Sequence, residues 1–272
     1  MDTDNIVSAI IVTHNRKELL PRAVASAISQ SYKHIEVIVV DDGSNDGTEE
    51  LVKTMIEDGV RLTYLRHNTP KGACAARNYG ISKAKGKYIA GLDDDDEWTE
   101  LRIELLLAAY EPKYAFVCAG DEWRSENGSS FVKRDSEIAL NNILFENVVG
   151  NQILTTKDKL MSIGGFDVNM PAAQDYDTWI RLIETHGSAL AIPEVLQIMY
   201  LSDNIPRITT SSSKFTGYLK CYLKHKHLMN STHRRFQLFI IYKARNKKMS
   251  LKTFFVLFDL YRPFFKIKNL LF

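Results

Sequence analysis

Apolar runs of strand length alternate with segments of helical period through the first half of the chain. Such runs occur at residues 7–12 (VSAIIV), 35–40 (IEVIVV), 61–65 (RLTYL) and 87–92 (KYIAGL). Between most of them, apolar residues recur at intervals of three and four, as they do along one face of a helix. This alternation is typical of a parallel sheet whose strands are joined by crossover helices. We therefore expect an α/β protein with a mostly parallel central sheet.

The remaining predicted elements become sparser toward the C-terminus. Helices are expected at 19–28, from Thr48 onward, at 72–84 and at about 99–109, and a further strand at 114–118. From 120 to 200 the periodicity weakens, and it predicts a helix at 175–186 and strands near 188–200. Residues 202–213 are rich in Ser and Thr, which indicates a loop.

The composition excludes several other kinds of protein. A chain of 272 residues with 45% hydrophobic and 25% charged residues has the balance of one large or two small globular domains, and not of a disordered or fibrous protein. The cysteines, Cys74, Cys118 and Cys221, include no close pair, which argues against a disulfide framework or a Cys-rich zinc site. The N-terminal apolar run is too short for a secretory signal. We therefore expect a cytoplasmic location.

Charge is distributed unevenly along the chain. Residues 1–200 hold 20 Lys and Arg against 31 Asp and Glu, a net −11, whereas residues 201–272 hold 15 against 2, a net +13. We expect residues 206–272 to form a basic, aromatic, helical extension. No apolar run in 252–272 approaches the ~18 residues of a spanning helix. The C-terminal end could lie on an anionic membrane surface, which would make the protein peripheral on the inner face of the membrane. Alternatively, it could pack as a cap on the preceding part of the chain or against a dimer partner.

Polar residues follow three of the predicted strands. They are the turn Thr13–Asn15, the stretch 41–44 (DDGS) and the four aspartates of 93–96. In open parallel sheets ligands bind beyond the carboxyl ends of the strands, so these segments should converge on one crevice. Each of them alone could be an ordinary turn, because Asp, Asn, Ser and Gly are favoured in turns for backbone reasons.

Two acidic stretches could bind a cation. Residues 42–47 match the start of a calcium loop, but position 12 of that loop is Lys53, where a bidentate glutamate is needed. The four adjacent carboxylates of 93–96 repel one another unless a cation or strong donors offset them. Oxygen ligands beside substrate phosphates are the usual setting of Mg²⁺ or Mn²⁺. The alternative is a solvated acidic turn that caps the helix starting near Thr99.

Six segments in order carry a resemblance to a known family. They are VSAIIVTHNRKELL, VIVVDDGSNDGT, GACAARNYGI, YIAGLDDDDEW, GGFD and QDYDTWIRL, spread over residues 7–186. Together they resemble the motifs of family 2 glycosyltransferases of the GT-A fold. The resemblance implies transfer of a sugar from a nucleotide diphosphate donor to an acceptor hydroxyl, with inversion at the anomeric carbon and with Mn²⁺ or Mg²⁺ as cofactor.

The resemblance also implies a domain organisation. Residues 1–205 would form the GT-A domain, with a Rossmann-like nucleotide-sugar-binding half at 1–98 and an acceptor and catalytic-base half at 99–205, followed by the extension at 206–272. The implied partners are a nucleotide diphosphate sugar, UDP-sugar being favoured, and a saccharide or lipid-linked acceptor in surface polysaccharide or glycoconjugate synthesis. No nucleic acid is expected as a partner.

Roles at the nucleotide follow residue by residue from the same resemblance. The turn formed by Thr13, His14 and Asn15 would hold the nucleoside together with Asp42, which would accept a hydrogen bond from the base. Arg77 of GACAARN would contact the nucleotide. His14 stands where many relatives carry Tyr, so base stacking is expected to differ, although imidazole can still stack.

Roles at the reacting centre are implied in the same way. The D-x-D of the family falls on Asp93 and Asp95, with Asp93 and Asp94 on the donor side, Asp94 as the ribose contact, and Asp95 as the metal ligand. Asp175 of QDYD is similar to the catalytic base of the family, and Trp179 would lie beside the acceptor. Relatives often carry a histidine in the loop after the last core strand, and no histidine stands there in this chain.

The residues themselves agree with one carboxylate for each role. An inverting transfer needs a base for the acceptor hydroxyl and an electrophile for the leaving group, but no covalent nucleophile. On a helix at 175–186, Asp175 and Trp179 share a face while Asp177 points elsewhere. Trp179 could instead be a core aromatic.

Two other functions stay open. One is a sugar nucleotidyltransferase, although no glycine-rich loop follows the first strand. The other is an inactive glycosyltransferase-like binding protein.

Overall fold

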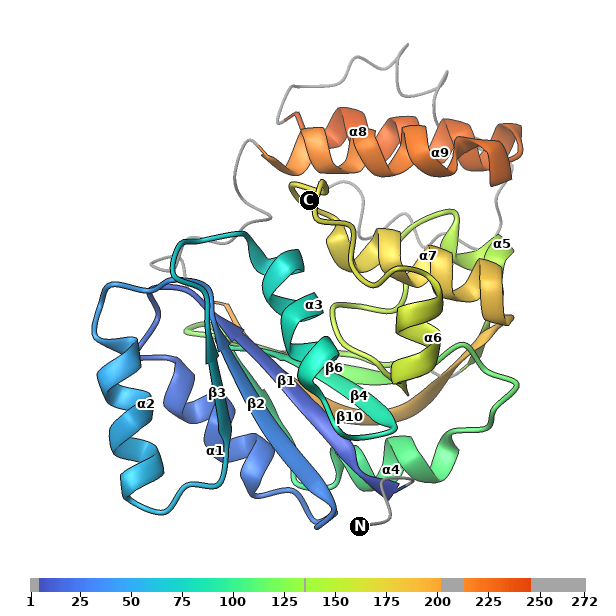
Figure 1. The fold of residues 1–272 in the computed structure, drawn as a ribbon. Helices are drawn as coiled ribbons and strands as arrows, with labels where there is room; N and C mark the ends of the chain where they lie inside the picture. Colours follow the sequence, from blue (N-terminus) through green and yellow to red (C-terminus); the bar gives the residue numbers. More distant parts are fainter. Residues whose placement is uncertain (1–4, 135, 202–212, 246–272) are drawn as a thin grey trace.

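The computed structural model describes residues 5–134, 136–201 and 213–245. Its centre is a ten-stranded sheet in the order β3-β2-β1-β4-β9-β6-β10-β5, with β7 paired to β6 and β8 to β10 (Figure 1). The strands are β1 (Val7–Thr13), β2 (Ile35–Asp41), β3 (Thr63–Arg66), β4 (Tyr88–Asp93), β5 (Asp96–Trp98), β6 (Val117–Ser125), β7 (Gly128–Val132), β8 (Ser136–Ile138), β9 (Leu154–Thr156) and β10 (Ala189–Tyr200).

The three longest strand pairings of the sheet are parallel, as the alternating pattern predicts. β1 lies between β2 and β4 and is parallel to both, and β6 is parallel to β10. The strands β5, β7, β8 and β9 are antiparallel to their neighbours, so the sheet is mixed. The register places Thr13 opposite Asp41 and Val12 opposite Asp93, so the first, second and fourth strands end level with one another. The expected α/β fold is confirmed.

Helices cover both faces of the sheet (Figure 1). They are α1 (Leu20–Ile28), α2 (Thr48–Glu57), α3 (Ala73–Lys83), α4 (Arg102–Ala109), α5 (Leu140–Ile143), α6 (Lys157–Ser162), α7 (Gln174–His186), α8 (Ser213–His225) and α9 (Ser231–Lys243). One core contains Ala9 and Ile11 of β1 with α1 and α4. The other contains Ile10 with α3 and α7. Side chains of neighbouring residues in one strand thus pack into the cores on opposite faces of the sheet. This packing explains why the strands are continuously apolar.

Several details differ from the pattern-based expectations. The strand expected at 114–118 begins at Val117 and runs to Ser125. The strands expected near 188–200 form one long strand, β10, with irregular register. β5, β7, β8, β9, α5 and α6 were not predicted. Most of these elements have three to six residues, too few to produce a periodic signal.

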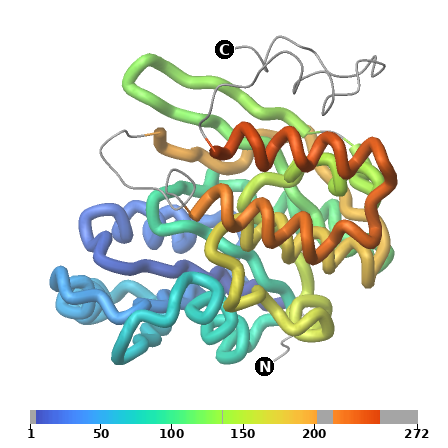
Figure 2. Tube along the Cα trace, turned by 90° about the horizontal axis from the view of Figure 1, so that it is seen from above, coloured from blue at the N-terminus to red at the C-terminus, as the bar shows by residue number. Residues whose placement is uncertain are grey.

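The described part of the C-terminal extension is helical, as expected. α8 and α9 pack side by side and lie over α7 (Figures 1 and 2). Cys221 and Met229 belong to the same hydrophobic core as α7, so residues 213–245 cap the second half of the fold. In the described ranges no helix is long and apolar enough to cross a bilayer. The expected loop at 202–213, except its last residue, and the expected membrane-facing end at 252–272 lie outside the described residues.

Candidate active site

The loops that follow β1 and β2 are joined by hydrogen bonds at the end of the sheet. Asn15 N–H donates to Ser44 Oγ at 2.8 Å, and Asn45 N–H donates to Asn15 Oδ1 at 2.8 Å. His14 Nδ1 donates to the Asp42 carbonyl oxygen at 2.8 Å. Asn15 has a φ of 52°, a backbone conformation that Asn tolerates better than most residues. His14 and Asn15 are exposed.

Asp42 directly follows β2 and is 4% exposed. His67 Nδ1 and Lys71 N–H donate to its Oδ1 at 2.7 and 2.9 Å, and Gly72 N–H donates to Oδ2 at 2.7 Å. Burial alone would raise the pKa of Asp42, but these hydrogen bonds from His67, Lys71 and Gly72 lower it below its ordinary value. The carboxylate therefore stays ionised and has acceptor capacity left on Oδ2.

His67 is a partner of Asp42 that the sequence did not indicate. It follows β3, its ring stacks on Tyr79 with centroids 5.2 Å apart, and it is 8% exposed. No motif surrounds it in the sequence, so only the pairing of β2 with β3 reveals its position.

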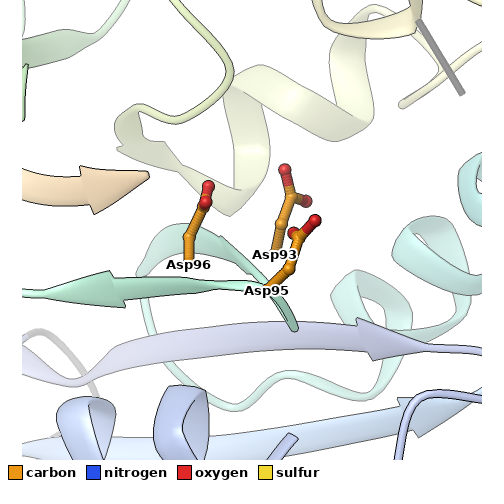
Figure 3. A group of neighbouring side chains, drawn as sticks. All are labelled: Asp93, Asp95 and Asp96. Carbon is orange, nitrogen blue, oxygen red and sulfur yellow. The ribbon is translucent and has the colours of Figure 1, made fainter. Parts of the chain in front are cut away.

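Three of the four consecutive aspartates lie close together. Figure 3 shows the side chains of Asp93, Asp95 and Asp96 side by side at the end of β4, and oxygens from all three lie within 4.8 Å of one another. Asn151 donates to Asp93 at 2.8 Å and to Asp96 at 3.0 Å. Gln197 of β10 donates to Asp96 at 2.9 Å. The two amides hold these carboxylates near one another.

Asp94 does not belong to this group. It is 4% exposed, and Arg16 Nη1 lies 2.9 Å from its carboxylate and 3.1 Å from that of Asp95. Burial raises the pKa of Asp94 to about 6, while Arg16 acts in the opposite direction. The separation of Asp94 from its neighbours follows from the turn between β4 and β5.

The alternative in which these aspartates cap the following helix is wrong. β5 begins at Asp96 and pairs with β10, and α4 begins only at Arg102. The geometry instead fits a divalent cation, since three carboxylates supply the hard oxygen ligands that Mg²⁺ and Mn²⁺ prefer. Asp95 was the expected metal ligand, and Asp96 joins it only because β5 turns its side chain back toward Asp93.

Arg77 links this acidic group to the N-terminus of α7. Its Nη2 donates to Asp93 Oδ1 at 2.8 Å, and its Nη1 donates to Gln174 Oε1 at 3.1 Å. Gln174 is the first residue of α7 and directly precedes Asp175. The positions expected for the nucleotide and for the base are therefore joined by one guanidinium group.

Asp175 lies in the first turn of α7. Asn147 Nδ2 donates to its Oδ2 at 2.9 Å. Burial raises the pKa of Asp175, and the Tyr176 N–H and Arg77 act against that rise. A carboxylate with a raised pKa is a better proton acceptor than an ordinary one, because its pKa lies nearer the working pH.

Trp179 lies in the core rather than at an open surface. It is 2% exposed, its ring packs near Phe116 and Phe166, and its indole N–H donates to the Gly150 carbonyl oxygen at 3.0 Å. The expectation that Trp179 lies beside the acceptor does not fit this burial, and the alternative of a core aromatic does. The large apolar ring is best accommodated between α7 and the sheet.

Asp177 points away from Asp175, as the helical spacing predicts. It is fully buried and contacts Arg181 on its own helix and both Lys224 and His225 on α8, each at 2.8 Å. Burial alone would raise its pKa, but His225, Lys224 and Arg181 lower it far below the ordinary value. Asp177 is therefore an ion-pair centre between α7 and α8.

Comparison with known proteins identifies the family. Residues 8–166 match the model of glycosyl transferase family 2. WcaA of Escherichia coli K12, which its name assigns to colanic acid biosynthesis, is 33% identical over 265 residues, 94% of each chain. TuaG of Bacillus subtilis, which its name assigns to teichuronic acid biosynthesis, is 27% identical over 84% of this chain and 92% of its own length.

Solved structures with low sequence identity share the fold. TarS 1–349 of S. aureus in complex with UDP-GlcNAc matches with a TM-score of 0.69 and 16% identity, over 94% of this chain and 76% of that one. The mannosyltransferase PcManGT of Pyrobaculum calidifontis, in complex with GDP-Man and Mn²⁺, matches with a TM-score of 0.66 and 18% identity, over 93% and 79%. By its sequence match and its fold, this chain belongs to glycosyl transferase family 2 and is a glycosyltransferase.

Proposed function

We propose that the chain is an inverting, metal-dependent glycosyltransferase that moves a sugar from a UDP-sugar to a saccharide or lipid-linked acceptor during surface polysaccharide synthesis. The observation that carries this proposal is the contact of Arg77 with both Asp93 and the residue before Asp175. A donor diphosphate at Asp93 and Asp95 would then place its sugar next to Asp175. This proximity is what a single displacement requires, because the hydroxyl that the base deprotonates attacks the anomeric carbon from which the diphosphate leaves.

Each of these side chains has one task in the proposed reaction. Asp175 accepts the proton of the acceptor hydroxyl as that oxygen attacks the anomeric carbon, and the bond to the diphosphate breaks on the opposite face. Arg77 stabilises the negative charge that develops on the leaving diphosphate. Asp93, Asp95 and Asp96 would hold Mn²⁺ or Mg²⁺, which would supply a Lewis acid for the diphosphate.

The nucleoside is proposed to bind at the loops after β1 and β2. The turn of Thr13, His14 and Asn15 would contact the nucleoside through its exposed residues His14 and Asn15, and Asp42 would accept a hydrogen bond from the base through the remaining capacity of Oδ2. Asp94 contacts the ribose. A UDP-sugar is favoured because WfaP of Escherichia coli, 40% identical over 111 residues, is by its name a glucosyltransferase that uses UDP-Glc and a lipid diphosphate-linked acceptor.

The surface of α8 and α9 suits an enzyme that meets its acceptor at a membrane. Residues 213–245 contain eight Lys and Arg and no Asp or Glu, and Lys220, Arg234 and Arg235 are exposed. A polybasic surface is attracted to anionic lipids by about 1 kcal/mol for each basic residue near the surface. We therefore propose that the protein is a cytoplasmic enzyme that binds the inner face of the membrane peripherally through this layer.

The proposal is tested with purified full-length protein and a panel of nucleoside diphosphates. UDP should raise the melting temperature in the presence of Mn²⁺ and much less in EDTA, since a ligand at 100 times its Kd stabilises by about 2.7 kcal/mol. Transfer from UDP-[¹³C]glucose to a diphosphate-lipid acceptor should give a product with inverted anomeric configuration by NMR. Stabilisation by UDP without turnover of any UDP-sugar, alone or with acceptor, would instead favour an inactive binding protein.

A further inference from the structure

Helix α9 carries a buried polar side chain, Gln237, that has no part in the site described above. Gln237 is 1% exposed. Its amide nitrogen lies at hydrogen-bonding distance from the carbonyl oxygens of Leu144 and Phe145, at 3.0 and 2.7 Å, and from the hydroxyl of Tyr176, at 2.6 Å. The two carbonyls follow the end of α5, where backbone acceptors have no partner within the helix. Gln237 therefore supplies a donor to these acceptors from another element of the fold.

The segment held by Gln237 leads directly to the partner of the proposed base. Asn147 lies two residues after Phe145, and its Nδ2 donates to Asp175 Oδ2 at 2.9 Å and to the Gly150 carbonyl oxygen at 2.9 Å. Its Oδ1 accepts from the N–H groups of Val149 and Gly150, each at 3.2 Å. Because both ends of the Asn147 amide are engaged, its orientation toward Asp175 depends on where the loop lies.

Tyr176, the neighbour of Asp175 on α7, meets the same segment. Its hydroxyl donates to the Ile143 carbonyl oxygen at 2.7 Å and accepts from Gln237, and the side chain is 2% exposed. The helix that carries Asp175 and the loop that carries Asn147 are thus tied together at Gln237.

We propose that Gln237 is a positioning residue for the transfer reaction: it fixes the segment from Leu144 to Asn147 against α7, so that Asn147 holds Asp175 in the orientation that accepts the acceptor proton. This inference rests on the proposed role of Asp175 as the base. The inference gives α9 a role in catalysis, although α9 lies outside the region 8–166 that matches the family model. This role belongs to its buried face and is separate from the membrane binding proposed for its exposed face.

The test compares Gln237→Met with a matched substitution on the same helix. Methionine keeps the length of the side chain but donates no hydrogen bond. Ile241→Met is the control, because Ile241 is also buried on α9, four residues after Gln237, and its side chain has no hydrogen-bonding group to lose. We expect Gln237→Met to lower kcat by about 10- to 100-fold, as small misplacements of reacting groups do. The KM for the UDP-sugar and the Kd for UDP should stay at the wild-type values, and Ile241→Met should keep the wild-type kcat.

A double substitution separates positioning from general loosening of the fold. If Gln237 acts through Asn147, then Gln237→Met combined with Asn147→Ala should lower kcat no further than Asn147→Ala alone. The inference is overturned by a wild-type kcat in Gln237→Met, by independent effects that multiply in the double variant, or by an equal loss of kcat in Ile241→Met.

Folding and the proposed function are controlled separately. UDP binding in each variant reports a folded nucleotide site. If Gln237→Met does not fold, Tyr176→Phe takes its place, since it removes the hydroxyl shared by Gln237 and Ile143. A loss confined to kcat supports the inference, and an unchanged kcat refutes it. Failure of the wild type to transfer, or full transfer by Asp175→Asn, would refute the proposed function instead.

Discussion

Replacement of Asp175 by asparagine tests the proposed proton transfer with little change of shape. The amide oxygen of the introduced side chain can still accept from Asn147 Nδ2, as Asp175 Oδ2 does at 2.9 Å. Arg77 keeps its ion pair with Asp93, so the donor site loses no direct contact. What is lost is the capacity to take a proton. We expect transfer to fall by ~10² to 10⁴, equivalent to a barrier higher by about 2.7 to 5.5 kcal/mol, with the Kd for UDP nearly unchanged.

The pH profile gives a second readout of the same substitution. Burial raises the pKa of Asp175, so the wild-type kcat/KM should fall on acidification with an apparent pKa above the ordinary ~3.9 of an aspartate. This acidic limb reports loss of the ionised base as pH decreases, and it should be absent from the residual activity of Asp175→Asn.

The control for Asp175→Asn is Glu184→Gln. Glu184 is an exposed carboxylate on the same helix, α7, and the proposed reaction does not use it. Initial rates with a fixed UDP-sugar and acceptor should be near wild type for Glu184→Gln. The assignment of Asp175 would be refuted by wild-type transfer in Asp175→Asn, by an equal loss in Glu184→Gln, or by retention of the anomeric configuration in the product.

Three further variants test other parts of the molecule. Asp95→Asn should abolish the Mn²⁺-dependent part of UDP binding in a thermal-shift titration without lowering the melting temperature of the free protein, because a crowded carboxylate is removed. Asp177→Asn should lower the free energy of unfolding in urea by about 3 to 5 kcal/mol at neutral pH, since it breaks a buried ion-pair network. Folding lowers the pKa of Asp177, so its ionised carboxylate stabilises the fold at pH values above the unfolded pKa of ~3.9. This contribution is lost as the pH falls below that value. The free energies of unfolding of the wild type and the variant should then converge. The double change Arg234→Glu and Arg235→Glu should reduce co-sedimentation with anionic vesicles at low salt while UDP binding persists, and undiminished sedimentation would place the membrane contact elsewhere.

The sequence predicts the strands of the first half of the chain well because their signals are local. Residues 7–12, 35–40 and 87–92 are apolar on both faces, and nearly all of each run lies within an observed strand of the parallel sheet. A strand that is apolar on both faces is typical of a parallel sheet covered by helices on both sides. The convergence of Thr13, Asp42 and Asp93 then follows from the parallel arrangement and its register.

The second half of the site depends on contacts between distant residues, which no local pattern encodes. Asp96 joins Asp93 because β5 pairs with β10, and Gln197 comes from 101 positions further along the chain. Trp179 has the helical spacing of a residue beside Asp175, yet tertiary packing places it in the core. Asn147 lies in an irregular segment with no motif around it, so only the fold shows that it contacts Asp175.

The acidic turn also explains why metal and nucleotide should bind together. Oxygens of Asp93, Asp95 and Asp96 lie within 4.8 Å of one another, and carboxylates at such distances repel unless positive charge offsets them. A diphosphate alone would add negative charge to this group, whereas a bound divalent ion would attract both the carboxylates and the diphosphate oxygens. Arg77, 2.8 Å from Asp93, offers a further positive charge on the same side. The Kd for UDP should therefore be lower with Mn²⁺ than without it, and by the same factor UDP should lower the Kd for Mn²⁺. Equal UDP affinity with and without Mn²⁺ would contradict this coupling.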